Sequence, residues 1–61
     1  MCLSTVMLEK NGIQEKVAEY VSAVKTEGDS IFLTDVMGSE VEVKGTLKSM
    51  DFVKNVIIVK A

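Results

Sequence analysis

The sequence predicts a mainly β domain, a small antiparallel barrel or sandwich of about six or seven short strands formed by residues 1–61 as one unit. Two observations support this fold class. Short segments alternate apolar and polar residues, and turn signals separate them at intervals of about 8–12 residues. The chain also lacks proline, internal repeats and low-complexity tracts, so nothing in it suggests a linker or a second domain.

A hairpin is expected at the N-terminal end. Residues 2–8 alternate loosely and contain β-branched side chains, which favour a strand. Asn11-Gly12 follows, and this dipeptide is the strongest short-range hairpin signal because both residues tolerate positive φ. The returning strand is therefore predicted over residues 13–17.

Residues 14–25 allow two interpretations. Apolar side chains recur there at helical spacing, so a helix from Gln14 to Lys25 competes with extended chain. We favour extended chain because residues 20–24 are rich in strand-favouring types. In addition, residues 26–29 look like a hairpin turn that leads directly into a strand at 31–34.

The middle of the chain continues the β pattern. Gly38 marks a turn within residues 35–39, and residues 40–44 then alternate strictly, as a strand with one buried and one solvated face does. An isolated glycine, Gly45, follows this strand. It predicts a bulge or a sharp bend.

The last two strands are expected over residues 46–52 and 56–59, with a turn at Asn55 between them. Every residue of the final segment, Val-Ile-Ile-Val, is apolar. Both faces of this strand should therefore be covered, by the sheet of the protein itself and by a second subunit.

The size of the chain favours self-association. A domain of about 60 residues buries only about 60% of the surface that its unfolded chain exposes, so it is marginally stable alone. The single cysteine rules out an internal disulfide, and the absence of histidine argues against a structural zinc site. A symmetric homodimer is the commonest remaining solution, and we expect one here.

Charge and composition exclude several classes of protein. The net charge is −2, all seven basic residues are lysines and only three residues are aromatic, a pattern that argues against nucleic-acid binding. No segment approaches the length of apolar sequence that spans a bilayer, and no secretory signal opens the chain. We therefore expect a cytoplasmic protein that does not bind membranes.

Enzymatic function is also disfavoured. Without histidine the chain has no ordinary Cys-His or Ser-His pair, and it has no glycine-rich phosphate loop. The acidic residues are scattered, as solvated surface residues usually are. Met7, Met37 and Met50 are expected to fill the core rather than to bind a soft metal. We expect no catalytic residues.

Cys2 is the one candidate for metal chemistry, and Met1 belongs to the same candidate site. If Met1 is removed, Cys2 carries both a thiol and the α-amine; if Met1 is retained, its amine, the Cys2 backbone nitrogen and the Cys2 sulfur lie in sequence around one point. Thiols (pKa about 8.5) and α-amines (about 7.7–8.0) release a proton readily to a metal. Such donors suit nickel, copper and zinc. The alternative is that Cys2 is a small buried hydrophobic residue, as lone cysteines often are.

The whole chain resembles the CooT family, on the opening Met1–Val6, the run Glu27–Glu40 and the following Gly45. The resemblance implies a small cytoplasmic β-rich homodimer that is associated with nickel insertion into carbon monoxide dehydrogenase. It also implies that Ni(II) is bound through the N-terminal cysteine region, which here is Cys2 with its neighbouring backbone nitrogens. The expected function is therefore that of a nickel chaperone whose client is carbon monoxide dehydrogenase.

In the expected site, two subunits bring their Cys2 residues together, and two thiolates with two nitrogens hold one Ni(II) in a square plane. Two other functions remain open at this point. One is a small RNA-binding or protein-interaction β module. The other is a HypC-like hydrogenase maturation chaperone, since that family also begins Met-Cys; however, it typically continues with a Pro-Gly turn, and this chain has no proline.

Overall fold

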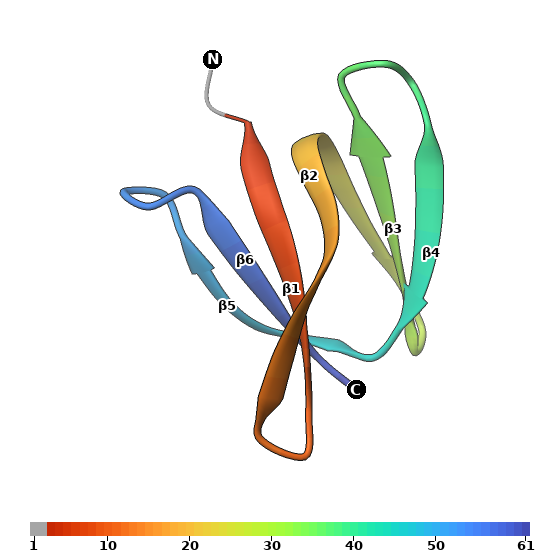
Figure 1. Ribbon diagram of the computed structural model, residues 1–61. Coiled ribbons are helices and arrows are strands. Elements are labelled where there is room, and N and C mark those ends of the chain that lie inside the picture. The colour runs from red at the N-terminus through yellow and green to blue at the C-terminus, as the bar shows by residue number, and fades with distance from the viewer. Residues whose placement is uncertain (1–2) are drawn as a thin grey trace.

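The computed structural model describes residues 3–61, and all the regular elements in this part of the chain are β-strands (Figure 1). The strands are β1 (Ser4–Lys10), β2 (Ile13–Glu27), β3 (Ser30–Asp35), β4 (Glu40–Lys44), β5 (Thr46–Asp51) and β6 (Val56–Lys60). Within this range there is no helix that could cross a membrane. The predicted mainly β class and the number of strands are confirmed.

The six strands form one sheet in the order β4-β3-β2-β1-β6-β5. Figure 1 shows β1, β5 and β6 on one side and β3 and β4 on the other, with β2 bending across between the two groups. The sheet coils so that β3 approaches β5. It does not close, and the predicted barrel is wrong in this respect, because β4 and β5 remain edge strands that each pair on one side only.

The expectation of a purely antiparallel sheet is wrong for one pair of strands. β6 runs parallel to β1, with Thr5 opposite Val56 and Leu8 opposite Val59. The apolar run that forms β6 lies between β1 and β5, in the interior of the sheet. Its alternate residues Ile57 and Val59 are buried, as expected of a central strand, whereas Val56 and Ile58 are half-buried.

Residues 14–25 are extended, so the helical alternative is excluded. The two short strands expected at residues 13–17 and 20–24 are parts of one strand, β2, which has 15 residues. It bends at Tyr20, whose φ is +57°, and irregular pairing with β3 follows the bend. The first part of β2 therefore pairs with β1 and the second part with β3.

The core lies inside the coil of the sheet. Alternation along the strands directs one apolar side chain in two toward this interior. Within the described chain, the buried apolar residues are Val6, Val21, Ile31, Leu33, Val43, Ile57 and Val59. Every strand except β5 contributes to this core, so β5 is held mainly by its hydrogen bonds to β6.

Gly45 forms the corner between β4 and β5, as its isolated position predicted. Its φ is +151°, and its N–H donates to the Asp29 carbonyl at 2.8 Å. A Cβ added at Gly45 would contact the Lys60 carbonyl oxygen and lie 3.1 Å from Val59 Cγ1. Because the Lys60 oxygen belongs to the backbone of β6, it cannot move aside as a flexible side chain would.

We therefore expect Gly45→Ala to destabilise the fold by about 2–4 kcal/mol, the sum of backbone strain and overpacking. Gly28→Ala is the control, since Gly28 also has positive φ (+60°) but no atom lies within 4 Å of the added Cβ. The control should lose only about 1–2 kcal/mol. Urea unfolding measures both values, and equal losses in the two variants would contradict the role assigned to the corner.

Candidate metal centre

The predicted ligands Cys2 and Met1 lie outside the described residues. What the structure gives is the surroundings of the point where β1 begins, two residues after the cysteine. Ser4 is buried there, and Leu3 is half-buried. The nature of the candidate site therefore depends on which elements surround Ser4 and on the side chains that they expose.

The turn between β5 and β6 lies directly beside the start of β1. The Asn55 carbonyl accepts a hydrogen bond from the Thr5 N–H at 2.9 Å. Asp51 shapes this turn, since its Oδ1 accepts the N–H groups of Val53 and Lys54 at 2.9 and 3.0 Å. The bond from the Lys54 N–H, aided by that from Val53, holds the pKa of the Asp51 carboxyl below its ordinary value. The turn is thus fixed in shape by its own aspartate.

The turn between β3 and β4 is built in the same way. Asp35 Oδ1 accepts the N–H groups of Met37 and Ser39 at 2.9 and 3.0 Å. The turn is also tied to the bend of β2, because the Val36 N–H donates to the Tyr20 carbonyl at 3.0 Å. Both turns therefore hold their tips in defined positions.

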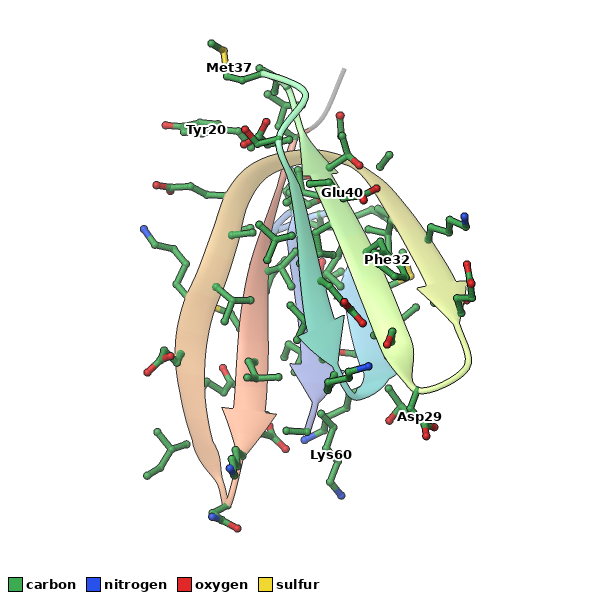
Figure 2. The ribbon with its side chains drawn as sticks, turned by 90° about the vertical axis from the view of Figure 1, so that its right-hand side faces the viewer. Tyr20, Asp29, Phe32, Met37, Glu40 and Lys60 are labelled. Atoms are coloured by element: carbon green, nitrogen blue, oxygen red, sulfur yellow. The ribbon has the colours of Figure 1, made fainter. Side chains whose placement is uncertain are left out.

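Exposed apolar side chains are concentrated at this end of the molecule. We use the name apolar end for Tyr20, Val36, Met37, Met50, Phe52 and Val53, all of which are exposed. The two turn tips are the most exposed, with 85% of Met37 and 93% of Val53 accessible to solvent. Figure 2 shows Tyr20 and Met37 together at the upper end, opposite Asp29 and Lys60.

A groove connects the apolar end to the start of β1. It has a volume of about 270 Å³ and lies between the second half of β2 and the edge strand β5. Its lining is mostly apolar and comprises Ser4, Val21, Ser22, Ala23, Val24, Met50, Phe52 and Ile57. The start of β1 therefore adjoins a hydrophobic surface rather than a charged one.

Residues 3–61 contain no group of three or more histidine, cysteine, aspartate or glutamate side chains that could hold a metal ion. Asp35 and Asp51 each accept two backbone N–H groups through Oδ1. The hypothesis of a metal site at this end therefore depends on the thiol of Cys2, the only cysteine of the sequence.

The sequence interpretation missed the apolar end. Met37 and Met50 were expected in the core and are exposed instead. A signal was nevertheless present, because each turn carries two large apolar residues directly after an aspartate, Val36-Met37 in one and Phe52-Val53 in the other. Turn tips are ordinarily polar, so apolar pairs at these positions indicate a surface that another molecule covers.

Comparison with known proteins gives a family and a fold. The family model described as "CO dehydrogenase accessory protein CooT" matches residues 1–60. Among solved structures, a candidate CooT from Carboxydothermus hydrogenoformans superposes with a TM-score of 0.87 at 17% identity, covering 97% of this chain and 95% of that one. No curated protein sequence matches the chain.

The structural likeness establishes the fold, and the family match covers nearly the whole chain, including both expected ligand positions. The family description also agrees with the absence of an enzymatic motif, because it names an accessory protein of an enzyme rather than an enzyme. The chain belongs to the CooT family of CO dehydrogenase accessory proteins.

Proposed function

We propose that this protein binds Ni(II) through Cys2 and delivers the ion to a carbon monoxide dehydrogenase during maturation of that enzyme. The observation that carries the proposal is the presence of a single thiol, at position 2, in a histidine-free chain of the CooT family. An accessory protein of a nickel enzyme that offers one strong metal-binding group is best explained as a carrier of the metal. Nickel is here the cargo.

The proposed donors are the Cys2 thiolate and nitrogen atoms of the chain terminus. If Met1 is retained, these are its α-amine and the Cys2 backbone nitrogen; if Met1 is removed, the α-amine is that of Cys2. Sulfur and nitrogen donors in one plane suit Ni(II). The thiol must stay reduced to bind the ion, so the proposal places the protein in a reducing compartment, the cytoplasm.

One chain cannot complete such a site. A square-planar site with two sulfur donors needs two thiols, and the sequence contains one. The proposal therefore includes a homodimer in which each copy contributes its Cys2. Chain connectivity keeps Cys2 within about 7 Å of the Cα of Ser4, so the two copies must meet near the start of β1.

The apolar end supplies a surface on which the two copies can meet near the start of β1. Met37 and Val53 project from turns that their own aspartates hold in place, so little conformational entropy is lost when a partner covers them. Burial of these side chains stabilises association through the hydrophobic effect. The dimer thus places two terminal segments, and with them two thiolates, side by side.

The proposed location of the site at the chain terminus also suits release of the nickel ion to the client enzyme. A site made of terminal residues at a surface can exchange ligands one at a time with an incoming protein, whereas a site caged inside the core cannot. The client's own ligands would replace the terminal nitrogens and then the two thiolates. No covalent chemistry is required of this protein.

Native mass spectrometry of the wild-type protein with one equivalent of Ni(II) per two chains tests the proposal. The expected species contains two chains and one nickel ion, and the mass also reports whether Met1 is present. Absorption from thiolate-to-nickel charge transfer should appear in parallel. A protein that stays free of nickel under these conditions would contradict the proposed function.

A further inference from the structure

The two edge strands of the sheet differ in how readily they accept a further strand. β5 is irregular, since its pairing with β6 shifts between Leu47 and Ser49. Bulges of this kind are among the devices by which native proteins block the edge of a sheet. β4, in contrast, pairs with β3 in unbroken register along its whole length, and no strand of residues 3–61 pairs with its other side. β4 is therefore the open edge.

Hydrogen bonds just beyond the two ends of β4 show which of its backbone groups face outward. At one end the Asp35 N–H donates to the Ser39 carbonyl at 3.0 Å. At the other end the Gly45 N–H donates to the Asp29 carbonyl at 2.8 Å. An antiparallel ladder is bonded at every second position, and both bonds place these positions at the odd-numbered residues of β4. The even-numbered residues therefore direct their N–H and C=O groups to the free edge; they are Glu40, Glu42 and Lys44.

An open groove runs beside this edge. It has a volume of about 610 Å³ and lies between β4 and the β1–β2 hairpin. Its apolar lining comes from both walls, with Leu8 and Val17 on one side and Val41 and Val43 on the other. The two valines of β4 project from the same face of the strand, but Val43 is buried, whereas 42% of Val41 is exposed. A strand added to β4 would cover Val41 with its own side chains.

The charge along β4 is complementary to a cationic segment. Glu40 and Glu42 project from the face of β4 that is turned away from the core, and Glu40 forms no ion pair within residues 3–61 (Figure 2). The one cation of the strand, Lys44, lies 3.0 Å from the Glu42 carboxylate. The same carboxylate accepts a hydrogen bond from Ser30 Oγ at 2.7 Å. The strand thus keeps one negative charge in excess.

Neither the opposite wall of the groove nor a second copy of the chain balances this charge. Lys10 and Lys16 belong to the opposite wall. Glu15 lies on the same wall, and Glu19 forms a 3.3 Å ion pair with Lys16, so this wall is neutral. Two copies of β4 that paired in the symmetric antiparallel register would bring their Glu42 side chains directly opposite each other, which is destabilising. A segment of a different protein fits better.

We propose that the free edge of β4 binds an extended segment of a partner protein in which apolar residues alternate with lysine or arginine. The segment adds a strand to the sheet, and its backbone bonds to the outward N–H and C=O groups of β4. Its apolar side chains enter the groove over Val41, and its cations lie on the other face, beside Glu40 and Glu42. The inference does not depend on nickel binding.

A capped seven-residue peptide of alternating lysine and valine is the probe, and it is titrated into the ¹⁵N-labelled protein. We expect its addition to shift the amide signals of β4 and to slow hydrogen exchange at the outward amides of that strand. A control peptide of the same composition, with its valines adjacent, should bind at least about five-fold more weakly. Absence of binding at millimolar peptide, or shifts confined to other strands, would overturn the proposal. So would outward amides that are already protected before the peptide is added, because a second copy would then cover the edge.

Two pairs of variants test the backbone bonds and the groove separately. Glu42→Pro removes an outward N–H, at a kind of position where edge strands tolerate proline, and Glu42→Ala removes the same carboxylate but keeps the N–H. Val41→Lys places a charge on the core-facing side of β4. Leu47→Lys does the same on β5, at a residue of similar exposure, 37% against 42%. Circular dichroism checks that each variant is folded.

We expect Glu42→Pro to bind the peptide at least about five-fold more weakly than Glu42→Ala, and Val41→Lys at least about five-fold more weakly than Leu47→Lys. Equal affinities within the first pair would rule out strand addition, and equal affinities within the second would rule out β4 as its place. If Glu42→Pro does not fold, the second pair decides alone. A failure to bind nickel would contradict the proposed function and leave this inference standing, because the peptide titration contains no metal.

Discussion

Replacing Cys2 with serine is expected to abolish nickel binding while leaving the β fold intact. Cys2 is the only thiol of the sequence, and a serine hydroxyl neither ionises at neutral pH nor matches the preference of Ni(II) for sulfur. The affinity should fall by more than about a hundred-fold, beyond what loss of an outer-sphere partner produces. The charge-transfer absorption should disappear completely, since it requires the thiolate.

The fold should tolerate this change because position 2 precedes β1, and the buried apolar residues of the described chain all belong to the strands. Isothermal titration and absorption spectroscopy measure binding, and circular dichroism measures the fold. Met50→Leu is the matched control, because Met50 is an exposed sulfur-containing side chain that lines the same groove as Ser4. The Met50→Leu variant should bind nickel with the affinity of wild type. An unaltered titration of Cys2→Ser would end the proposal, and weakened binding by Met50→Leu would add a thioether to the ligands.

Local signals in the sequence predicted the strands well. Asn11-Gly12 forms a hairpin with positive φ at both residues, and the alternating residues 40–44 form β4 with Val43 buried. Gly45 forms the bend that its isolation suggested. In each case the decisive physics, namely the φ range of one residue or the period of two in a strand, acts within a few neighbours.

Non-local features were predicted less well. The helical and extended interpretations of residues 14–25 differ little in local propensity, and pairing of β2 with both β1 and β3 decides between them. The parallel pairing of β1 with β6 joins the two ends of the chain, and no turn signal encodes it. Whether the sheet closes depends on the coiling of all six strands together.

The candidate site also combines features that the sequence predicts with features that only the fold creates. The chemistry of the donors could be predicted because it depends on Cys2 and on the absence of histidine. The apolar pairs in the two turns were visible in the sequence, but their assembly into one apolar end was not, because Tyr20, Val36 and Phe52 come from three separate segments that only the fold brings together.

Placing a charge on the apolar end is expected to separate the proposed dimer without unfolding the monomer. Met37→Glu and Val53→Glu change side chains that are 85% and 93% exposed, so each should alter the stability of the isolated chain by no more than about 0.5 kcal/mol. In a dimer that covers these tips, a carboxylate would be buried without a partner. The free energy of association should then fall by about 2–4 kcal/mol, which is roughly a thirty- to thousand-fold rise in the dissociation constant.

Ile13→Glu is the matched control, because Ile13 is also a large apolar residue with 72% of its surface exposed but lies in the β1–β2 hairpin. Sedimentation velocity, with and without nickel, should show monomers for the two turn variants and dimers for wild type and Ile13→Glu. The nickel affinity of the turn variants should also fall, because each monomer offers one thiolate where the square-planar site needs two. If all three variants remain dimeric, the copies meet elsewhere on the molecule; if Ile13→Glu alone dissociates, they meet at the opposite end, and the two Cys2 residues cannot share one ion.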